Sequence, residues 1–126
     1  MKKIKIHAQE IGSIDATISE EKNPETAKKI IEALPIESKA RIWGDEIYFD
    51  IPVHLGEENP QVEVEVGSMA YWPPGNSFCI FFGRTPASSG ELPAAASPVN
   101  VFGKVDGDSA VFRKVKNGDL IRIEEA

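Results

Sequence analysis

The chain has 126 residues, of which 41% are hydrophobic and 27% charged, a composition typical of soluble globular proteins. It carries 20 acidic against 14 basic residues, whereas a nucleic-acid partner requires a basic surface. We therefore expect one domain over residues 1–126 that does not bind nucleic acid.

Three features of the sequence favour a cytoplasmic protein without membrane contact. No apolar run approaches the roughly 20 residues that cross a bilayer, and no apolar segment of a signal peptide follows the N-terminal MKKIKIH. Cys79 is the only cysteine, so the chain forms no internal disulfide, as is common in reducing compartments.

The first elements are a strand pair and a helix. Residues 3–7 and 13–18 alternate polar and apolar side chains, and the short connection at Gly12 predicts antiparallel pairing. Asn23 is a suitable N-cap for a helix that ends before Pro35. Its apolar stripe, at spacing i, i+3, i+4 and i+7, consists of Ala27, Ile30, Ile31 and Leu34.

Short strands dominate the rest of the chain. The alternating patterns predict strands over residues 36–42, 47–51, 61–66 (with its three valines inward), 99–105, 110–115 and 120–123. Residues 85–98 are rich in Pro, Ala and Ser, which predicts a surface loop, either functional or a mere connection. About eight to ten strands with one or two helices favour a closed barrel, because closure removes exposed strand edges.

Aromatic residues gather between Gly67 and Gly83, around the turn Pro73-Pro74-Gly75. At a barrel rim, Tyr71 and Trp72 would hold an extended peptide or a small apolar ligand. Trp43 and Tyr48 are candidates for the facing wall. The alternative is that these rings fill the end of the barrel as part of its core.

Other chemistry finds little support in the sequence. His7 and His54 are the only histidines, and their spacing to Cys79 fits neither a zinc site nor a nucleophile–base pair. Cys79 is interpreted as a small buried hydrophobe. The adjacent acids Asp45 and Glu46 fall in a predicted turn, where we expect them to be solvated. No metal or cofactor is therefore expected.

Several segments together resemble cyclophilins: Ser68-Met69-Ala70, then residues 76–80, then Asn100-Val101-Phe102-Gly103-Lys104-Val105. The pattern from Gly67 to Pro86 is most similar to the small, atypical cyclophilin-like proteins of bacteria and archaea. The resemblance covers about residues 36–123. It implies a closed eight-stranded antiparallel barrel, capped by one or two short helices.

The resemblance also implies a proline-binding cleft. A strand equivalent to Met69-Ala70 lines it in the family, Ser77 matches a glutamine, and Cys79 matches a pocket phenylalanine. A register shift of one residue would place Phe78 there in place of Cys79.

The family's catalytic arginine has no counterpart at its own position, because the matching strand Tyr48-Phe49-Asp50 places Asp50 there. Arg41 and Arg84 are the candidates to substitute for it, and each is otherwise a solvated surface charge.

The sequence thus favours a cyclophilin-like domain that binds a peptide segment or small ligand in an aromatic cleft, without efficient isomerase activity. A divergent peptidyl-prolyl isomerase and a structural or assembly module are the alternatives, as a monomer or small homo-oligomer. The candidate ligand-binding residues are Trp43, Tyr48, Met69, Tyr71, Trp72, Ser77, Phe78 and Cys79.

Overall fold

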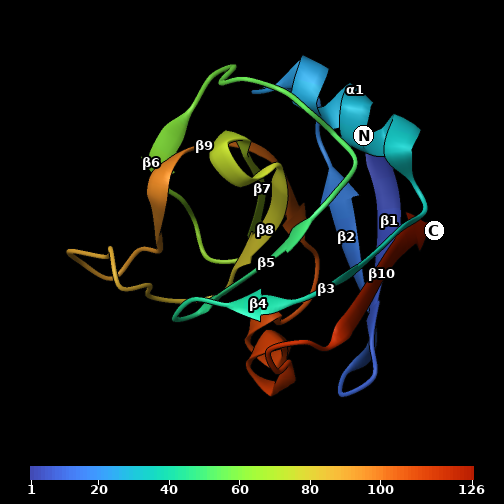
Figure 1. Cartoon of the computed structure of the whole chain (residues 1–126), viewed down its shortest axis with the longest axis vertical. Coiled ribbons are helices and arrows are strands. Elements are labelled where there is room, and N and C mark those ends of the chain that lie inside the picture. The colour runs from blue at the N-terminus through green and yellow to red at the C-terminus, as the bar shows by residue number, and fades with distance from the viewer.

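The computed structural model describes residues 1–126 and contains ten strands, one α-helix and two 3-10 helices (Figure 1). The first half holds β1 (Lys2–Ala8), β2 (Gly12–Ile18), α1 (Pro24–Ala33), β3 (Ile36–Lys39), β4 (Arg41–Ile42), β5 (Glu46–Asp50) and β6 (Gln61–Glu63). The second half holds β7 (Ser68–Trp72), η1 (Pro73–Gly75), β8 (Ser77–Phe81), β9 (Ala94–Val105), η2 (Ser109–Lys114) and β10 (Leu120–Glu125).

The strands form one antiparallel sheet in the order β3-β10-β1-β2-β9-β7-β8-β5-β4, with β6 paired to β9 outside this path. The sheet curls but does not close, so the prediction of a closed eight-stranded barrel is wrong. The reason lies at Ala40, which hydrogen-bonds to Gly118 and Asp119, the two residues just before β10. It divides the predicted strand 36–42 into β3 and β4. The two edge strands are thus successive pieces of one segment, paired with β10 and β5 respectively.

Three other predicted elements differ from the structure. Residues 110–115 lie largely in η2, because the Asp108 carboxylate accepts a hydrogen bond from Ala110 N at 3.0 Å and begins a helical turn. In the predicted strand 61–66, only residues 61–63 are strand, and Val64 alone of its valines is buried. The predicted loop 85–98 ends early, since β9 begins at Ala94.

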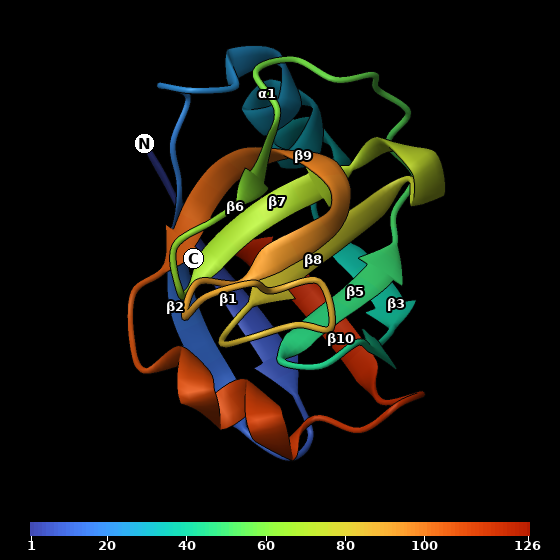
Figure 2. The same cartoon turned by 90° about the vertical axis from the view of Figure 1, so that its left-hand side faces the viewer.

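Helix α1 follows its predicted apolar stripe but not its predicted cap. Asn23 makes no capping bond; its side chain instead donates to Val101 O at 2.8 Å and accepts from Asn59 N at 2.7 Å. The Glu58 carboxylate accepts the free backbone N–H groups of Glu25 and Thr26, both at 3.1 Å. The helix and η2 lie at opposite ends of the curled sheet (Figure 2). None of the helices combines the length and hydropathy that a membrane span requires.

The sheet separates two hydrophobic clusters of unequal size. The larger cluster has 24 buried residues, draws on most strands and both α1 and η2, and forms the main core. The smaller cluster lies on the other face of β5, β7 and β8. Its six buried residues are Val64, Ala70, Cys79, Phe81, Ala95 and Val99.

Candidate functional site

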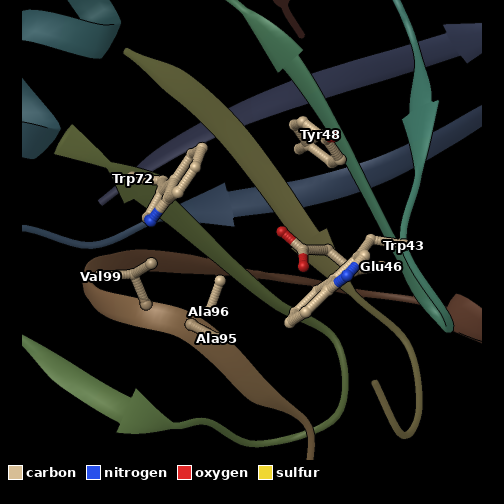
Figure 3. A pocket seen from close by; sticks show the side chains of 7 residues that line it. All are labelled: Trp43, Glu46, Tyr48, Trp72, Ala95, Ala96 and Val99. Atoms are coloured by element: carbon tan, nitrogen blue, oxygen red, sulfur yellow. The ribbon is translucent and has the colours of Figure 1, made fainter. Parts of the chain in front are cut away.

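A pocket of about 160 Å³ opens beside the smaller cluster, between β5, β7 and the first half of β9 (Figure 3). Six of its seven lining residues are hydrophobic, and Glu46 is the exception. The lining consists of Trp43, Glu46, Tyr48, Trp72, Ala95, Ala96 and Val99.

Strand alternation explains which side chains reach the pocket. Glu46 and Tyr48 are two residues apart on β5 and therefore share a face. Opposite them on β8 stand Phe81 and Cys79, which belong to the smaller cluster. The intervening Ile47 points to the main core. One face of the sheet thus forms the floor of the pocket.

A tight hairpin turn positions Trp43 and Glu46. Trp43 N donates to Glu46 O at 2.9 Å, and Glu46 N donates to Trp43 O at 3.2 Å. Between them Gly44 adopts a φ of +61°, and an added Cβ there would lie 2.8 Å from Pro86 Cδ. The turn is therefore held by a backbone conformation and a close contact that favour glycine.

The aromatic walls are fixed by their own contacts. Trp72 Nε1 donates to Ser97 Oγ at 2.7 Å, which ties β7 to β9. The rings of Trp72 and Tyr48 meet edge to face, with centroids 6.4 Å apart. Arg41 lies over the Tyr48 ring, 5.0 Å from its centroid, and pairs with Asp50.

Glu46 sets the electrostatics of the pocket. Only 6% of it is exposed, and it takes part in none of the nine ion pairs of the protein. Burial raises its pKa from the ordinary 4.5 to about 7, and the neighbouring Cys79 thiol opposes that rise. Burial raises the pKa of Cys79 well above its ordinary value, with the neighbouring carboxylate adding to the effect.

The structure brings together three of the predicted ligand-binding residues. Trp43, Tyr48 and Trp72 line the pocket, and Cys79 lies beneath it in the smaller cluster. Ser77 is buried, and its hydroxyl donates to Gly75 O at 2.9 Å.

The other three, Met69, Tyr71 and Phe78, face the main core on the opposite side of the sheet. The Tyr71 hydroxyl donates to Val53 O at 2.6 Å, which ties the ring to that side. Of the two registers left open for β8, the pocket face carries Cys79 and not Phe78.

The two candidate arginines lie outside the pocket lining. Arg41 is engaged by Asp50 and Tyr48, and Arg84 Nη2 donates to Ser88 O at 3.4 Å. The structure also contains no group of three or more His, Cys, Asp or Glu residues that could hold a metal ion.

Glu46 is one of the four lining residues that sequence reasoning missed. It was expected to be a solvated turn residue, and this prediction is wrong. The signal was present, because extending the alternation of β5 by one residue places Glu46 on the face of Tyr48. Ala95, Ala96 and Val99 also line the pocket and were missed because residues 85–98 were interpreted as a loop and residues 99–105 as an ordinary strand.

Comparisons with known proteins bear on this fold. A family model described as cyclophilin-like matches residues 2–124, which confirms the resemblance noted in the sequence. Among solved structures, the chain is similar to a hypothetical protein from Archaeoglobus fulgidus, determined in solution, with 38% identity and a TM-score of 0.82. The match covers 99% of this chain and 95% of the archaeal one. The comparison with curated proteins returned no match.

Proposed function

The chain belongs to the cyclophilin-like family, and we propose that it binds a small organic ligand, or one side chain of a peptide segment, in the pocket lined by Trp43, Tyr48 and Trp72. The observation that carries this proposal is the convergence of three aromatic residues on one open cavity, two from the β4–β5 hairpin and one from β7. Ligand pockets are typically lined by aromatic and other hydrophobic side chains, together with a small number of polar groups.

The size of the pocket favours a compact ligand. Its volume of about 160 Å³ is close to that of an engineered protein cavity of about 150 Å³ that binds benzene. Such a space accommodates a ring, a branched alkyl group or one side chain, with the rest of a longer ligand lying outside.

The polar groups favour binding over prolyl isomerisation. Stabilising a twisted prolyl amide calls for a hydrogen-bond donor beside it, and the family's arginine is replaced by Asp50. Arg41 and Arg84 lie outside the lining, and the charged group inside it is a carboxylate. A divergent isomerase therefore remains the second hypothesis, to be separated by experiment.

The two tryptophans give a direct test, since they are the only two in the chain and both line the pocket. Their indole N–H signals in ¹H–¹⁵N NMR spectra should shift when 3,3-dimethylbutanol or an Ala-Pro peptide is added. In the same peptide sample, cis–trans exchange cross-peaks measure isomerase activity. Indole shifts without faster exchange support binding, whereas faster exchange would support the isomerase.

A matched pair of variants controls this test. Ala96 is exposed at the pocket wall, so Ala96→Phe should obstruct the cavity without disturbing the core. Ala87 is also exposed but lies outside the lining, so Ala87→Phe should leave the indole shifts unchanged. If Ala96→Phe leaves them unchanged too, the ligand binds elsewhere and the proposal fails.

A further inference from the structure

We propose that the ligand of this pocket carries an alkylated ammonium group, which sits against the rings of Trp43, Tyr48 and Trp72 and pairs with the Glu46 carboxylate. This inference rests on the proposed function and names the chemical class of the ligand. It follows from the charge, the burial and the neighbours of Glu46.

A buried carboxylate without a cationic partner costs free energy when ionised. Only 6% of Glu46 is exposed, yet no Lys, Arg or His pairs with it. What Glu46 lacks is a positive charge, and the pocket leaves space for one.

The side-chain arrangement places that charge among aromatic rings. Figure 3 shows the Glu46 carboxylate directed into the cavity between Trp43, Trp72 and Tyr48. Cations are attracted to the faces of aromatic rings, tryptophan most strongly, and recognition of quaternary ammonium groups is the best-known use of such cages. The carboxylate and the rings therefore favour the same occupant.

The rest of the lining selects an alkylated ammonium over a bare one. A primary ammonium has three donors to satisfy, whereas Ala95, Ala96 and Val99 offer only apolar side chains to the pocket. Methyl groups on the nitrogen would pack on these side chains and remove the need for further acceptors.

Glu46 is the only charged residue in the pocket lining. Arg41 lies over Tyr48, pairs with Asp50 and is not part of the lining. Cys79 is held as the neutral thiol by its raised pKa. A bound cation would favour the ionised form of Glu46, so affinity should increase as the pH rises through about 7.

A pair of ligands with the same shape isolates the charge. Choline and 3,3-dimethylbutanol differ in having a quaternary nitrogen or a quaternary carbon. Titrations followed by the two indole N–H signals should show choline binding about tenfold or more tightly, as expected for a cation on rings and a carboxylate. In Glu46→Gln this preference should disappear, while binding of 3,3-dimethylbutanol is retained.

The adjacent acid supplies the control variant. Asp45→Asn removes the same charge one residue away, at a side chain that pairs with Arg113 and lies outside the lining, and should keep the preference for choline. If Glu46→Gln does not fold, the pH series replaces it: choline affinity in the unmodified protein should rise between about pH 6 and about pH 8, and that of 3,3-dimethylbutanol should stay constant.

The outcomes separate the two proposals. Equal affinity for the two compounds would overturn the cation inference and leave the proposed binding function standing. Indole signals that respond to neither compound, nor to the Ala-Pro peptide, would overturn both. A trimethyllysine peptide that binds more tightly than choline would support the inference and identify a protein side chain as the source of the cation. If choline binds more tightly than the peptide, the inference is also supported, and the source of the cation is a free small molecule.

Discussion

At the scale of single residues, the burial of Glu46 links stability to pH. Its pKa of about 7, above the ordinary 4.5, means that the folded state binds more protons than the unfolded state between these values. The contribution of Glu46 to the free energy of unfolding therefore falls as the pH rises from about 4.5 to about 7, and it is constant above about 7. A shift of this size corresponds to at most about 3 kcal/mol, reduced because the carboxylate borders an open pocket.

We therefore expect Glu46→Gln to gain stability relative to the unmodified protein as the pH rises. Urea denaturation at several pH values between about 5 and about 8 measures the difference in unfolding free energy, which should grow by up to about 3 kcal/mol. Comparing the two proteins cancels contributions from other acids. A difference that does not change with pH would show that Glu46 is as well solvated in the folded state as in the unfolded one.

Single residues also mark the limit of the sequence interpretation. Trp43, Tyr48 and Trp72 were predicted as a cleft because large aromatic residues stood near turns, and the structure gathers them in one lining. Glu46 was missed because hydrophilic residues beside a turn are usually solvated. Residues of β9 line the pocket together with Glu46, and no local sequence pattern reveals that β9 lies across the pocket from β5.

At the scale of elements, helix α1 depends on a cap supplied from a distant segment. The Glu58 carboxylate accepts Glu25 N, Thr26 N and Thr26 Oγ1, and these bonds lower its pKa although its desolvation opposes them. We expect Glu58→Ala to cost about 1 kcal/mol of unfolding free energy, as loss of an N-cap does. Glu57→Ala, at the adjacent exposed acid, is the control for urea denaturation. Equal stability of both variants would mean that water caps the helix as well as Glu58 does.

The β4–β5 turn makes a second prediction at this scale. Gly44→Ala introduces a Cβ at a φ of +61° and 2.8 Å from Pro86 Cδ, whereas Gly12→Ala meets a similar φ of +72° with nothing within 4 Å. Both variants bear the conformational cost of about 1 kcal/mol, and Gly44→Ala adds the clash. It should be the less stable variant in thermal denaturation, with altered tryptophan fluorescence because Trp43 moves. Equal melting temperatures would show that the contact with Pro86 relaxes freely.

Elements differ in how far the sequence determines them. The β1–β2 pairing was predicted correctly from alternation and a short connection. The strand 36–42 was not, because its division at Ala40 follows from hydrogen bonds to Gly118 and Asp119, far along the chain. The η2 segment likewise alternates as a strand would, but the Asp108 carboxylate and the packing of Phe112 into the main core stabilise a helix there.

At the scale of the whole molecule, the sheet supports two clusters that differ in how deeply they are covered. The main core is enclosed by the curled sheet and by α1 and η2, whereas the smaller cluster is covered by the first half of β9 and by Val64, next to β6. This part of β9 pairs with β6 and is tied to β7 by the Trp72–Ser97 hydrogen bond. The smaller cluster has six buried residues and the main core has 24. The first half of β9, which covers the smaller cluster, should therefore open at a lower free energy than the whole fold unfolds.

Cys79 reports this opening, because it is the only thiol and belongs to the smaller cluster. It is 1% exposed, and its raised pKa keeps it protonated, so a thiol reagent reacts only after the cover has moved.

We expect the rate of the Cys79 reaction to depend on urea less steeply than global unfolding does, since less surface is exposed in the opening. Ser97→Ala, which removes the tie to Trp72, should accelerate the reaction several-fold with little change in global stability. Ser89→Ala, at an exposed loop serine outside the pocket lining, should not. A urea dependence equal to that of global unfolding, unchanged in Ser97→Ala, would mean that both clusters open together and that the pocket is as rigid as the core.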